Sequence, residues 1–363
     1  MTVVFAGGGT GGHLYPAIAI ADALRGRSAQ IAFIGAADRL EATIVPKAGY
    51  ALDTIASRPL PRALSFGLFA TLASNLRGTL QSLRLLAARR PDLVIATGGY
   101  VCFPVALAAR IRRAFGLSTA PVVLLEPNVS PGLTNRLLAP IVDEIWGSAP
   151  ADSRAERKYR ATGVPIRASL RALPRREDAI AALGLDPSLR TLVAMGGSQG
   201  ARSINDALVA LVESGAVPPG WQVLALTGAG DYERVRASLP HSRPYLDDMA
   251  DAYAVADLVL ARAGASTLGE LAALGKPAIL VPYPFAAEDH QTANATRFER
   301  AGAAVVLTDD ELRAGGLAAA LASAAGEPRL RELTDAAARL AGGDPLDAIL
   351  ARIDALAARK NAA

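Results

Sequence analysis

A glycine-rich turn follows an apolar strand at two places in this 363-residue chain, and the sequence after each turn repeats in the same order. Residues 2–6 (TVVFA) run into 7–12 (GGGTGG), and residues 191–195 (TLVAM) run into 196–200 (GGSQG). The apolar runs 92–97 and 257–261, and then 121–125 and 277–281, extend the repeat. The pattern predicts two α/β domains of the same kind in tandem, each with a turn suited to an anion after its first strand. A substrate held between the domains would meet both turns.

Short apolar runs without alternation mark the predicted strands. Strands of this kind are buried on both faces, as in parallel sheets covered by helices. They are predicted at 2–6, 30–34, 51–55, 93–97, 121–125, 142–146, 191–195, 222–226, 257–261, 277–281 and 304–307. Helices are predicted in the gaps, notably at 14–26, 65–89, 101–113 and 131–139. We expect domains over residues 1–163 and 164–344, and a final helix, about 345–363, with an amphipathic pattern suited to packing back on the first domain.

Charge is divided unevenly along the chain. Residues 1–160 carry 18 Lys and Arg against 10 Asp and Glu, whereas residues 161–363 carry 20 against 24. Because one half is basic and the other acidic, we predict that the two halves bind different partners. The single cysteine, Cys102, excludes an internal disulfide. We expect no signal peptide and no membrane-spanning helix, because the start lacks a basic segment and no apolar run reaches about 20 residues.

The first glycine-rich turn, 7–12, matches the pattern G-x-G-x-x-G. Backbone N–H groups of such a turn can approach an anion at the start of the next helix, although the same pattern also occurs in turns that bind nothing. A dinucleotide site would place an acid at the end of the second strand. This chain has Gly35 there, and the nearest acid is Asp38. The turn therefore favours a phosphate ligand over NAD.

His13 closes this turn and is one of three histidines. The positive end of the helix dipole disfavours a protonated imidazole, so a neutral His13 beside an anion is a candidate general base. The alternative is a histidine that bonds a backbone carbonyl at a helix start. We favour the catalytic role because the turn supplies a ligand for the imidazole to act on.

The second glycine-rich turn, 196–200, precedes a helix predicted to begin near Arg202. Ser198 and the nearby backbone N–H groups are candidates to hold a diphosphate, which the helix dipole would stabilise without a metal. The chain contains no Asp-x-Asp, the usual metal ligand of metal-dependent sugar transferases. Arg167, just after the predicted boundary, is either a partner for a leaving phosphate or an exposed hinge arginine.

Two polar segments follow strands in the second half. Glu270 could clasp both hydroxyls of a ribose, but Thr267-x-x-Glu270 is also a capping box, and spacing alone favours the cap. Gln291 follows a strand at the edge where α/β sheets bind ligands, so it is a candidate to hydrogen-bond a sugar hydroxyl. A helix cap by Asp289 is the alternative.

Apolar side chains recur at helical spacing between residues 66 and 83, with arginines around them. The apolar positions are Phe66, Phe69, Ala70, Ala73, Leu76, Leu80 and Leu83, and the arginines include Arg62, Arg77 and Arg84. Core packing explains most such stripes, but between Asp53 and Glu126 nine arginines accompany one acid, Asp92. A basic amphipathic surface favours an anionic membrane. The small number of aromatic residues argues against nucleic acid.

In their residues and in their order along the chain, these motifs resemble those of the peptidoglycan N-acetylglucosaminyltransferases of glycosyltransferase family 28. The segments that carry the resemblance are GGGTGGH at 7–13, TGGY at 97–100, 126–128, GGSQGAR at 196–202, 247–249, 263–270 and HQTANA at 290–295. The resemblance implies an α/β fold of the GT-B class, with two Rossmann-like parallel-sheet domains facing across a cleft. It implies an inverting, metal-independent transfer of N-acetylglucosamine from UDP-GlcNAc to the C4 hydroxyl of the N-acetylmuramic acid of lipid I, which is linked to undecaprenyl diphosphate. The product is lipid II.

The resemblance also implies roles for individual residues. His13 would serve the acceptor hydroxyl, and Glu270 would bind the ribose rather than cap its helix. The donor-binding positions are Thr10, Gly11, Gly12, Asn128, Arg167, Ser198, Leu246, Ala265, Ser266, Thr267, Leu268, Gly269, Glu270 and Gln291. The positions for the acceptor diphosphate are Gly8, Gly9, Gly99 and Tyr100, and those for the membrane are Phe66, Phe69, Leu76, Arg77 and Arg84. No metal and no cofactor is implied.

The implied partners are UDP-GlcNAc, lipid I and an anionic membrane surface, without nucleic acid. The protein would be peripheral, on the cytoplasmic face of the plasma (inner) membrane. Two alternatives stay open at this point. One is another GT-B transferase with a lipid acceptor, such as a diacylglycerol galactosyltransferase, and the other is a protein that binds a nucleotide sugar or NAD without transferring anything.

Overall fold

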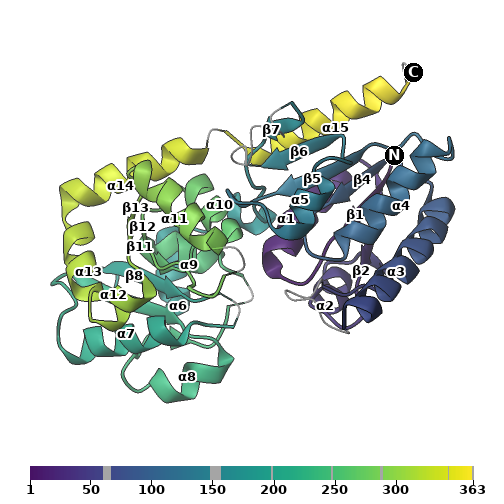
Figure 1. The fold of residues 1–363 in the computed structure, drawn as a ribbon. Coiled ribbons are helices and arrows are strands. Elements are labelled where there is room, and N and C mark those ends of the chain that lie inside the picture. Colours follow the sequence, from purple (N-terminus) through teal and green to yellow (C-terminus); the bar gives the residue numbers. More distant parts are fainter. Residues whose placement is uncertain are drawn as a thin grey trace. The chain divides into compact units, whose positions relative to one another are not determined.

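The computed structural model describes residues 1–59, 67–147, 157–197, 199–246, 248–286, 289–341 and 343–361. The chain forms two compact units (Figure 1). Unit 1 comprises residues 1–167 and 344–363, and unit 2 comprises residues 168–343. The division comes after Arg167 instead of after residue 163. Arg167 therefore belongs to unit 1, which corrects its expected place in the second domain.

Within the described residues, unit 1 contains a seven-stranded parallel sheet with the order β3-β2-β1-β4-β5-β6-β7. The strands are β1 (Thr2–Ala6), β2 (Gln30–Gly35), β3 (Ala51–Thr54), β4 (Leu93–Ala96), β5 (Val122–Glu126), β6 (Glu144–Gly147) and β7 (Tyr159–Ala161). The first six correspond to predicted strands. β7 does not, because it lies at the end of the charged stretch 152–160, whose composition is typical of a linker. The strand order reverses between β1 and β4, which is where such sheets bind ligands.

Helices cover both faces of this sheet, as its apolar strands predict. They are α1 (Gly11–Gly26), α2 (Glu41–Lys47), α3 (Gly67–Arg89), α4 (Cys102–Ala114), α5 (Leu133–Leu138) and α15 (Pro345–Asn361). On β1, Val3 and Phe5 enter a core shared with α1 and α15, whereas Val4 and Ala6 enter a second core shared with α4. Alternate residues of a strand point to opposite faces, so a strand covered on both sides has no polar face.

The C-terminal helix α15, yellow in Figure 1, packs on the sheet of unit 1. Its apolar face places Leu346, Ile349, Leu350, Ile353 and Leu356 in the core that contains Val3 and Phe5. These are the five positions that gave the tail its amphipathic pattern. The helix thus covers apolar side chains of residues 1–167, and its own apolar face becomes part of the same core.

An ion pair also attaches α15 to the sheet. Nε of Arg352 donates to Oε2 of Glu144 on β6 at 3.2 Å, and the Trp146 indole donates to the same oxygen at 2.9 Å. Burial alone would raise the pKa of Glu144, but hydrogen bonds from Arg352 and Trp146, and the charges of Arg352 and Arg160, lower that pKa overall. The carboxylate is therefore held in its ionised form.

Within the described residues, unit 2 contains a six-stranded parallel sheet with the order β10-β9-β8-β11-β12-β13. The strands are β8 (Arg190–Met195), β9 (Trp221–Leu226), β10 (Ser242–Arg243), β11 (Ala256–Ala261), β12 (Ala278–Leu280) and β13 (Ala304–Val306). The two-residue β10 has no predicted counterpart. The order reverses between β8 and β11, so unit 2 repeats the plan of unit 1 around the second glycine-rich turn.

Nine helices are described in unit 2. They are α6 (Arg176–Leu183), α7 (Arg202–Glu213), α8 (Ala229–Val235), α9 (Ala250–Val255), α10 (Ala265–Ala273), α11 (His290–Arg300), α12 (Asp309–Arg313), α13 (Leu317–Ala325) and α14 (Glu327–Ala341). Side chains of α7, α12, α13 and α14 share one core with the strands. Across the described parts of both units, no helix has the length and apolar composition needed to cross a bilayer.

Candidate active site

In unit 1, the turns after β1 and β4 pack directly against each other. These strands are neighbours in the sheet, so their C-terminal ends lie side by side where the strand order reverses. At Gly99 the contact is so close that an added Cβ would lie 2.5 Å from the carbonyl oxygen of Gly8. Gly99 also has a φ of +82°, so glycine is required there on both counts. The predicted acceptor-diphosphate residues Gly8, Gly9, Gly99 and Tyr100 therefore come from two contacting turns.

His13 lies in the first turn of α1, against the turn after β4. The carbonyl oxygen of the N-cap residue, Thr10, accepts hydrogen bonds from the N–H groups of His13 and Leu14 at 3.2 and 3.3 Å. A Cβ at Gly98 would lie 2.4 Å from Nδ1 of His13, so the imidazole packs on the bare backbone of that glycine. The side chain of His13 is half-buried. A histidine at a helix N-terminus is thus placed where two predicted ligand-binding turns meet.

Glu41, on α2, is a site residue that the motif analysis missed. Its carboxylate is fully buried, and it accepts the N–H of Gly9 at 2.9 Å and the N–H of Ala36 at 3.0 Å. Ala36 follows β2, so an acid does reach the end of the second strand, although it is turned inward. The only signal in the sequence was an acidic residue at the start of a short apolar segment. Acidic residues are common at helix starts, so this signal did not indicate a site residue.

The turn after β5 is organised by the buried carboxylate of Glu126. Its Oε1 accepts from the backbone and side-chain nitrogens of Asn128 at 2.9 and 3.1 Å, and its Oε2 accepts from the side chain of Asn135 at 2.6 Å. Asn128, a predicted donor-binding residue, is therefore held in one orientation. Asn135 on α5 did not figure among the predicted residues, because it lies outside the three-residue motif.

Arg167 stacks on an aromatic ring of α1. Its guanidinium carbon lies 4.8 Å from the ring centroid of Tyr15, a distance at which a cation is attracted by the ring face. Tyr15 in turn packs close to Gly11, where an added Cβ would lie 3.0 Å from the ring. This arginine therefore lies near the N-terminus of α1 and is not an exposed hinge residue.

In unit 2, the second glycine-rich turn packs on the end of β9. A Cβ at Gly200 would lie 2.1 Å from the carbonyl oxygen of Thr227, and Gly200 has a φ of +75°. α7 begins at Arg202, as predicted, and the side chain of Asn205 holds the same carbonyl oxygen of Thr227 at 2.9 Å. Ser198 lies outside the described residues. Leu246 is half-buried in the segment after β10.

The capping box that spacing alone favoured at Thr267 and Glu270 is absent. α10 begins at Ala265 with Gly264 at the N-cap, so Thr267 is already inside the helix and makes no cap. Glu270 is buried, and its Oε2 accepts a hydrogen bond from the phenol of Tyr253 at 2.7 Å. The six predicted donor-binding residues from Ala265 to Glu270 thus form the first turns of α10, in which Leu268 and Glu270 are buried.

Gln291 lies in the first turn of α11, and its Oε1 accepts the backbone N–H of Tyr283 at 2.9 Å. The N-cap residue is Asp289, with a φ of +52°, but its side chain caps no backbone N–H and instead accepts from the Thr292 hydroxyl at 2.6 Å. The side-chain cap by Asp289, which was the alternative to a ligand-binding role for this segment, is therefore absent. The bond from Tyr283 leaves Nε2 of Gln291 as the end of the amide that can donate to a ligand.

A buried network around Arg262 joins the end of β11 to the starts of α7 and α12. Arg262, directly after β11, lies 2.8 Å from Asp309 and donates to the Ser203 hydroxyl at 2.8 Å. Burial would raise the pKa of Asp309, but hydrogen bonds from Ser203, Arg313 and Arg262 lower it overall. This network fixes these chain segments at the point where the strand order reverses.

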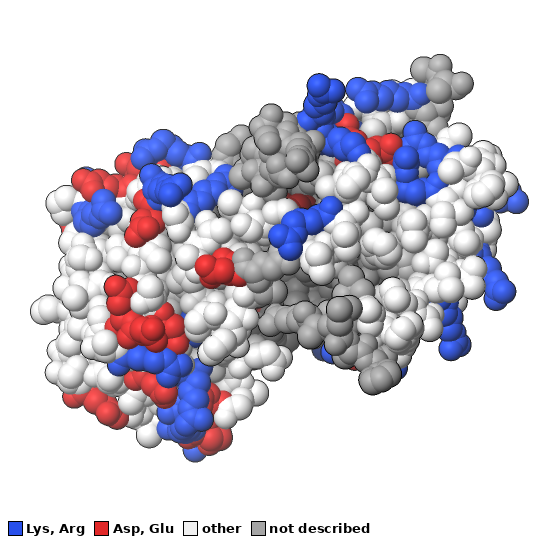
Figure 2. Space-filling view, viewed as in Figure 1, with Lys and Arg blue, Asp and Glu red and all other residues white. Residues whose placement is uncertain are grey.

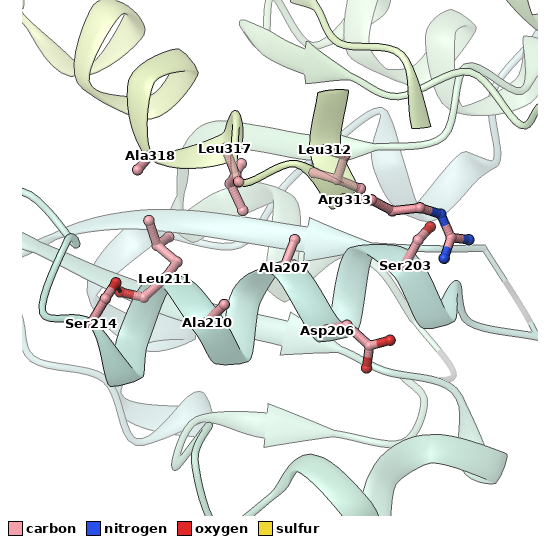
Figure 3. Close-up of a pocket in the computed structure, with 11 residues that line it drawn as sticks. Ser203, Asp206, Ala207, Ala210, Leu211, Ser214, Leu312, Arg313, Leu317 and Ala318 are labelled. Carbon is pink, nitrogen blue, oxygen red and sulfur yellow. Dashed lines mark hydrogen bonds between the residues drawn. The ribbon is translucent and has the colours of Figure 1, made fainter. Parts of the chain in front are cut away.

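A cavity of about 500 Å³ lies in unit 2 between α7 and the segment that contains α12 and α13 (Figure 3). Ala207, Ala210 and Leu317 line its middle, with Asp206 and Arg313 toward one end and Ser214 at the other. Among the described residues, none of the predicted donor-binding positions lines it.

Comparison with known proteins decides the family. The model of the glycosyltransferase family 28 N-terminal domain matches residues 3–146, and that of the C-terminal domain matches residues 191–342. The chain belongs to glycosyltransferase family 28. Curated family-28 relatives are named UDP-N-acetylglucosamine--N-acetylmuramyl-(pentapeptide) pyrophosphoryl-undecaprenol N-acetylglucosamine transferase. The protein from Halothermothrix orenii is 43% identical over 86% of this chain and 87% of its own length, and that from Desulforudis audaxviator is 39% identical over 99% of both.

Solved structures agree on the fold of this family-28 chain. A crystal structure of Acinetobacter baumannii MurG has a TM-score of 0.75 at 24% identity, covering 97% of this chain and 99% of that one. The calicheamicin glycosyltransferase CalG4 has a TM-score of 0.70 at 17% identity, covering 99% and 98%. The predicted GT-B fold with two Rossmann-like parallel sheets is therefore confirmed.

Proposed function

We propose that this family-28 chain transfers N-acetylglucosamine from UDP-GlcNAc to lipid I and so forms lipid II for peptidoglycan synthesis. The observation that carries the proposal is the set of relatives named for this reaction, which match 86–99% of the chain at 37–43% identity. The two family models, over residues 3–146 and 191–342, include the turns after β1, β4, β8 and β11, where the strand order reverses.

We assign donor binding chiefly to residues of unit 2 that follow β8, β11 and β12. The N-terminus of α7 attracts the diphosphate, the carboxylate of Glu270 accepts from the ribose hydroxyls, and the amide of Gln291 donates to the sugar. The bonds from Tyr253 and Tyr283 support these roles, because each holds its partner side chain in one orientation before a ligand arrives.

The reaction is a direct displacement at the anomeric carbon. The C4 oxygen of the acceptor attacks that carbon while the bond to the UDP oxygen breaks, and the configuration inverts. His13 accepts the proton of the C4 hydroxyl, and UDP leaves with the bonding electron pair. The start of α7 and the guanidinium of Arg167 stabilise the charge that grows on the diphosphate, so the step requires no metal ion.

We further propose that α3 lies on an anionic membrane at the cytoplasmic face. Phe69, Leu72, Leu76 and Leu80 share one side of α3, and each is more than half exposed. The opposite side is packed so closely that a Cβ at Gly78 would lie 2.0 Å from the carbonyl oxygen of Ala56. Core packing, which was the alternative, does not account for these four side chains, whereas Leu83 of the predicted stripe packs against the core. Phe66 and Arg62 lie outside the described residues.

Charge supports the same surface. Arg77 and Arg84 are exposed on α3. On the face shown in Figure 2, unit 1 carries Lys and Arg with few acids, whereas unit 2 carries both signs. Apolar side chains surrounded by arginine suit the boundary of an anionic bilayer.

The experiment that tests the reaction is transfer of radiolabelled N-acetylglucosamine from UDP-GlcNAc to a lipid I analogue by the purified protein. We expect a labelled lipid-linked disaccharide and stoichiometric release of UDP. Binding of UDP-GlcNAc without transfer would identify a nucleotide-sugar-binding protein. Transfer only to a different lipid, in competition between acceptors, would identify another GT-B transferase.

A further inference from the structure

We propose that Glu41 is a positioning residue for the acceptor side of the reaction. Its buried carboxylate holds the turn after β1 in the shape that presents His13. This inference rests on the proposed function, in which His13 accepts the proton of the acceptor hydroxyl. It concerns a residue that lies outside every motif by which the family was recognised.

The carboxylate joins the ends of two adjacent strands. Oε2 of Glu41 accepts the N–H of Gly9 in the turn after β1, and Oε1 accepts the N–H of Ala36 directly after β2, at 2.9 and 3.0 Å. The side chain is fully buried. Buried hydrogen bonds are costly to break without a replacement partner, so these two bonds fix Gly9 relative to the sheet.

The surrounding backbone is shaped around this carboxylate. A Cβ at Gly8 would lie 2.1 Å from Oε1 of Glu41, and a Cβ at Gly35 would lie 2.7 Å from its Cγ. The other side of the turn is equally confined, because Gly99 packs on the carbonyl oxygen of Gly8. The turn is therefore held between the Glu41 side chain and the turn after β4.

This arrangement changes the role expected for Gly9. Its N–H, which the glycine pattern offered to the acceptor diphosphate, is engaged by Glu41. The groups at the start of α1 follow immediately, with Thr10 as the N-cap and His13 in the first turn. Glu41 thus sets where α1 begins, and a displacement of about 1 Å at a reacting group can cost about 100-fold in rate.

The test is Glu41→Gln in the full-length protein, since the amide keeps the shape but replaces one acceptor by an N–H₂ donor. We expect the acceptor KM to rise and kcat to fall, each about tenfold or more. The KM for UDP-GlcNAc should rise less, because Thr10, Gly11 and Gly12 are the only donor-binding positions in this turn, and most of the others lie in unit 2. Hydrogen–deuterium exchange of the peptide that contains residues 7–12 should become faster. Unchanged acceptor KM and kcat, or an equal rise in both KM values, would overturn the proposal.

Two further variants separate positioning from stability. Glu144→Gln removes another buried carboxylate of unit 1, far from the turn in sequence, and should lower the melting temperature without changing the acceptor KM. Gly35→Ala displaces Glu41 without altering its charge and should reproduce the acceptor defect even if Glu41→Gln does not fold. If wild-type protein transfers nothing to lipid I, the proposed function fails. Hydrogen–deuterium exchange of the peptide that contains residues 7–12 still tests whether Glu41 holds the turn in place.

Discussion

The phenol of Tyr253 donates a 2.7 Å hydrogen bond to the carboxylate of Glu270, and both side chains are buried. Tyr253 lies on α9 and Glu270 on α10, with strand β11 between them in the chain. The carboxylate assigned to the ribose is therefore oriented by a residue that belongs to no recognisable motif. A buried carboxylate that loses such a donor loses one of its hydrogen bonds and its fixed direction.

Tyr253→Phe should weaken donor binding. Loss of one hydrogen bond to a charged group costs about 1.5–3 kcal/mol, which corresponds to roughly a tenfold or larger rise in the KM for UDP-GlcNAc. Steady-state kinetics with varied UDP-GlcNAc measure this. Tyr50→Phe is the matched control, because the Tyr50 phenol donates to Asp22 in unit 1 at 2.6 Å and takes no part in donor binding. A Tyr253→Phe enzyme with the donor KM of the wild type would contradict the role of this pair.

His13→Ala should lower kcat by about 10²–10⁴-fold, the usual contribution of a general base. The KM for UDP-GlcNAc should change little, because the donor residues that we assign lie mainly in unit 2. Single-turnover transfer to a lipid I analogue separates the chemical step from product release. His241→Ala, a histidine near the two-residue strand β10, should retain wild-type activity. Near-wild-type turnover of His13→Ala at saturating substrates would remove His13 from the mechanism.

Replacing the exposed apolar residues of α3 should abolish membrane binding. We expect wild-type protein to float with anionic liposomes at low salt and less at high salt, since ions screen the arginines. The double variant Phe69→Glu with Leu76→Glu should stay unbound at both salt concentrations. Phe285→Glu is the matched control, because Phe285 is as exposed as Phe69, at 78% against 74%, but lies in unit 2. Failure of the wild type to bind anionic vesicles at low salt would refute the membrane proposal.

The ion pair between Glu144 and Arg352 should make unit 1 sensitive to acid. The pKa of Glu144 is lowered in the folded protein, so its stabilising contribution is complete above the ordinary value of 4.5 and is lost as the pH falls through the folded-state pKa. Arg352→Met should cost about 2 kcal/mol at pH 7, a value between those of exposed and buried pairs. Thermal unfolding from pH 7 to pH 3 measures the difference from wild type, which should narrow as the pH falls. A difference that stays constant over this range would argue against the ion pair.

Local signals predicted much of the fold and the position of the site. Apolar strands and glycine-rich turns are recognisable in short segments, since a strand buried on both faces must be apolar and a residue with positive φ is favourable only for glycine. Gly99 and Gly200 illustrate this, because each combines a positive φ with backbone contact. The turns after β1 and β8 could therefore be found without coordinates.

Side-chain caps inferred from residue spacing at helix starts were not found in the structure. Thr267 and Glu270 have the spacing of a capping box, but Gly264 is the N-cap, and Glu270 is engaged by Tyr253 from another helix. Asp289 is at an N-cap position, but its positive φ accompanies a bond to Thr292 and not to the backbone. In both cases a polar partner elsewhere replaced the local hydrogen bond that the spacing suggested.

The amino-acid sequence alone specifies two α/β units with a ligand-binding turn after the first strand of each, because hydrophobicity and glycine placement act over a few residues. It does not specify which groups satisfy the buried carboxylates. Gly9 with Glu41, Tyr253 with Glu270 and Arg352 with Glu144 are separated by 32, 17 and 208 residues. A buried charge needs a partner, and the packed chain alone determines which distant segment brings that partner within hydrogen-bonding distance.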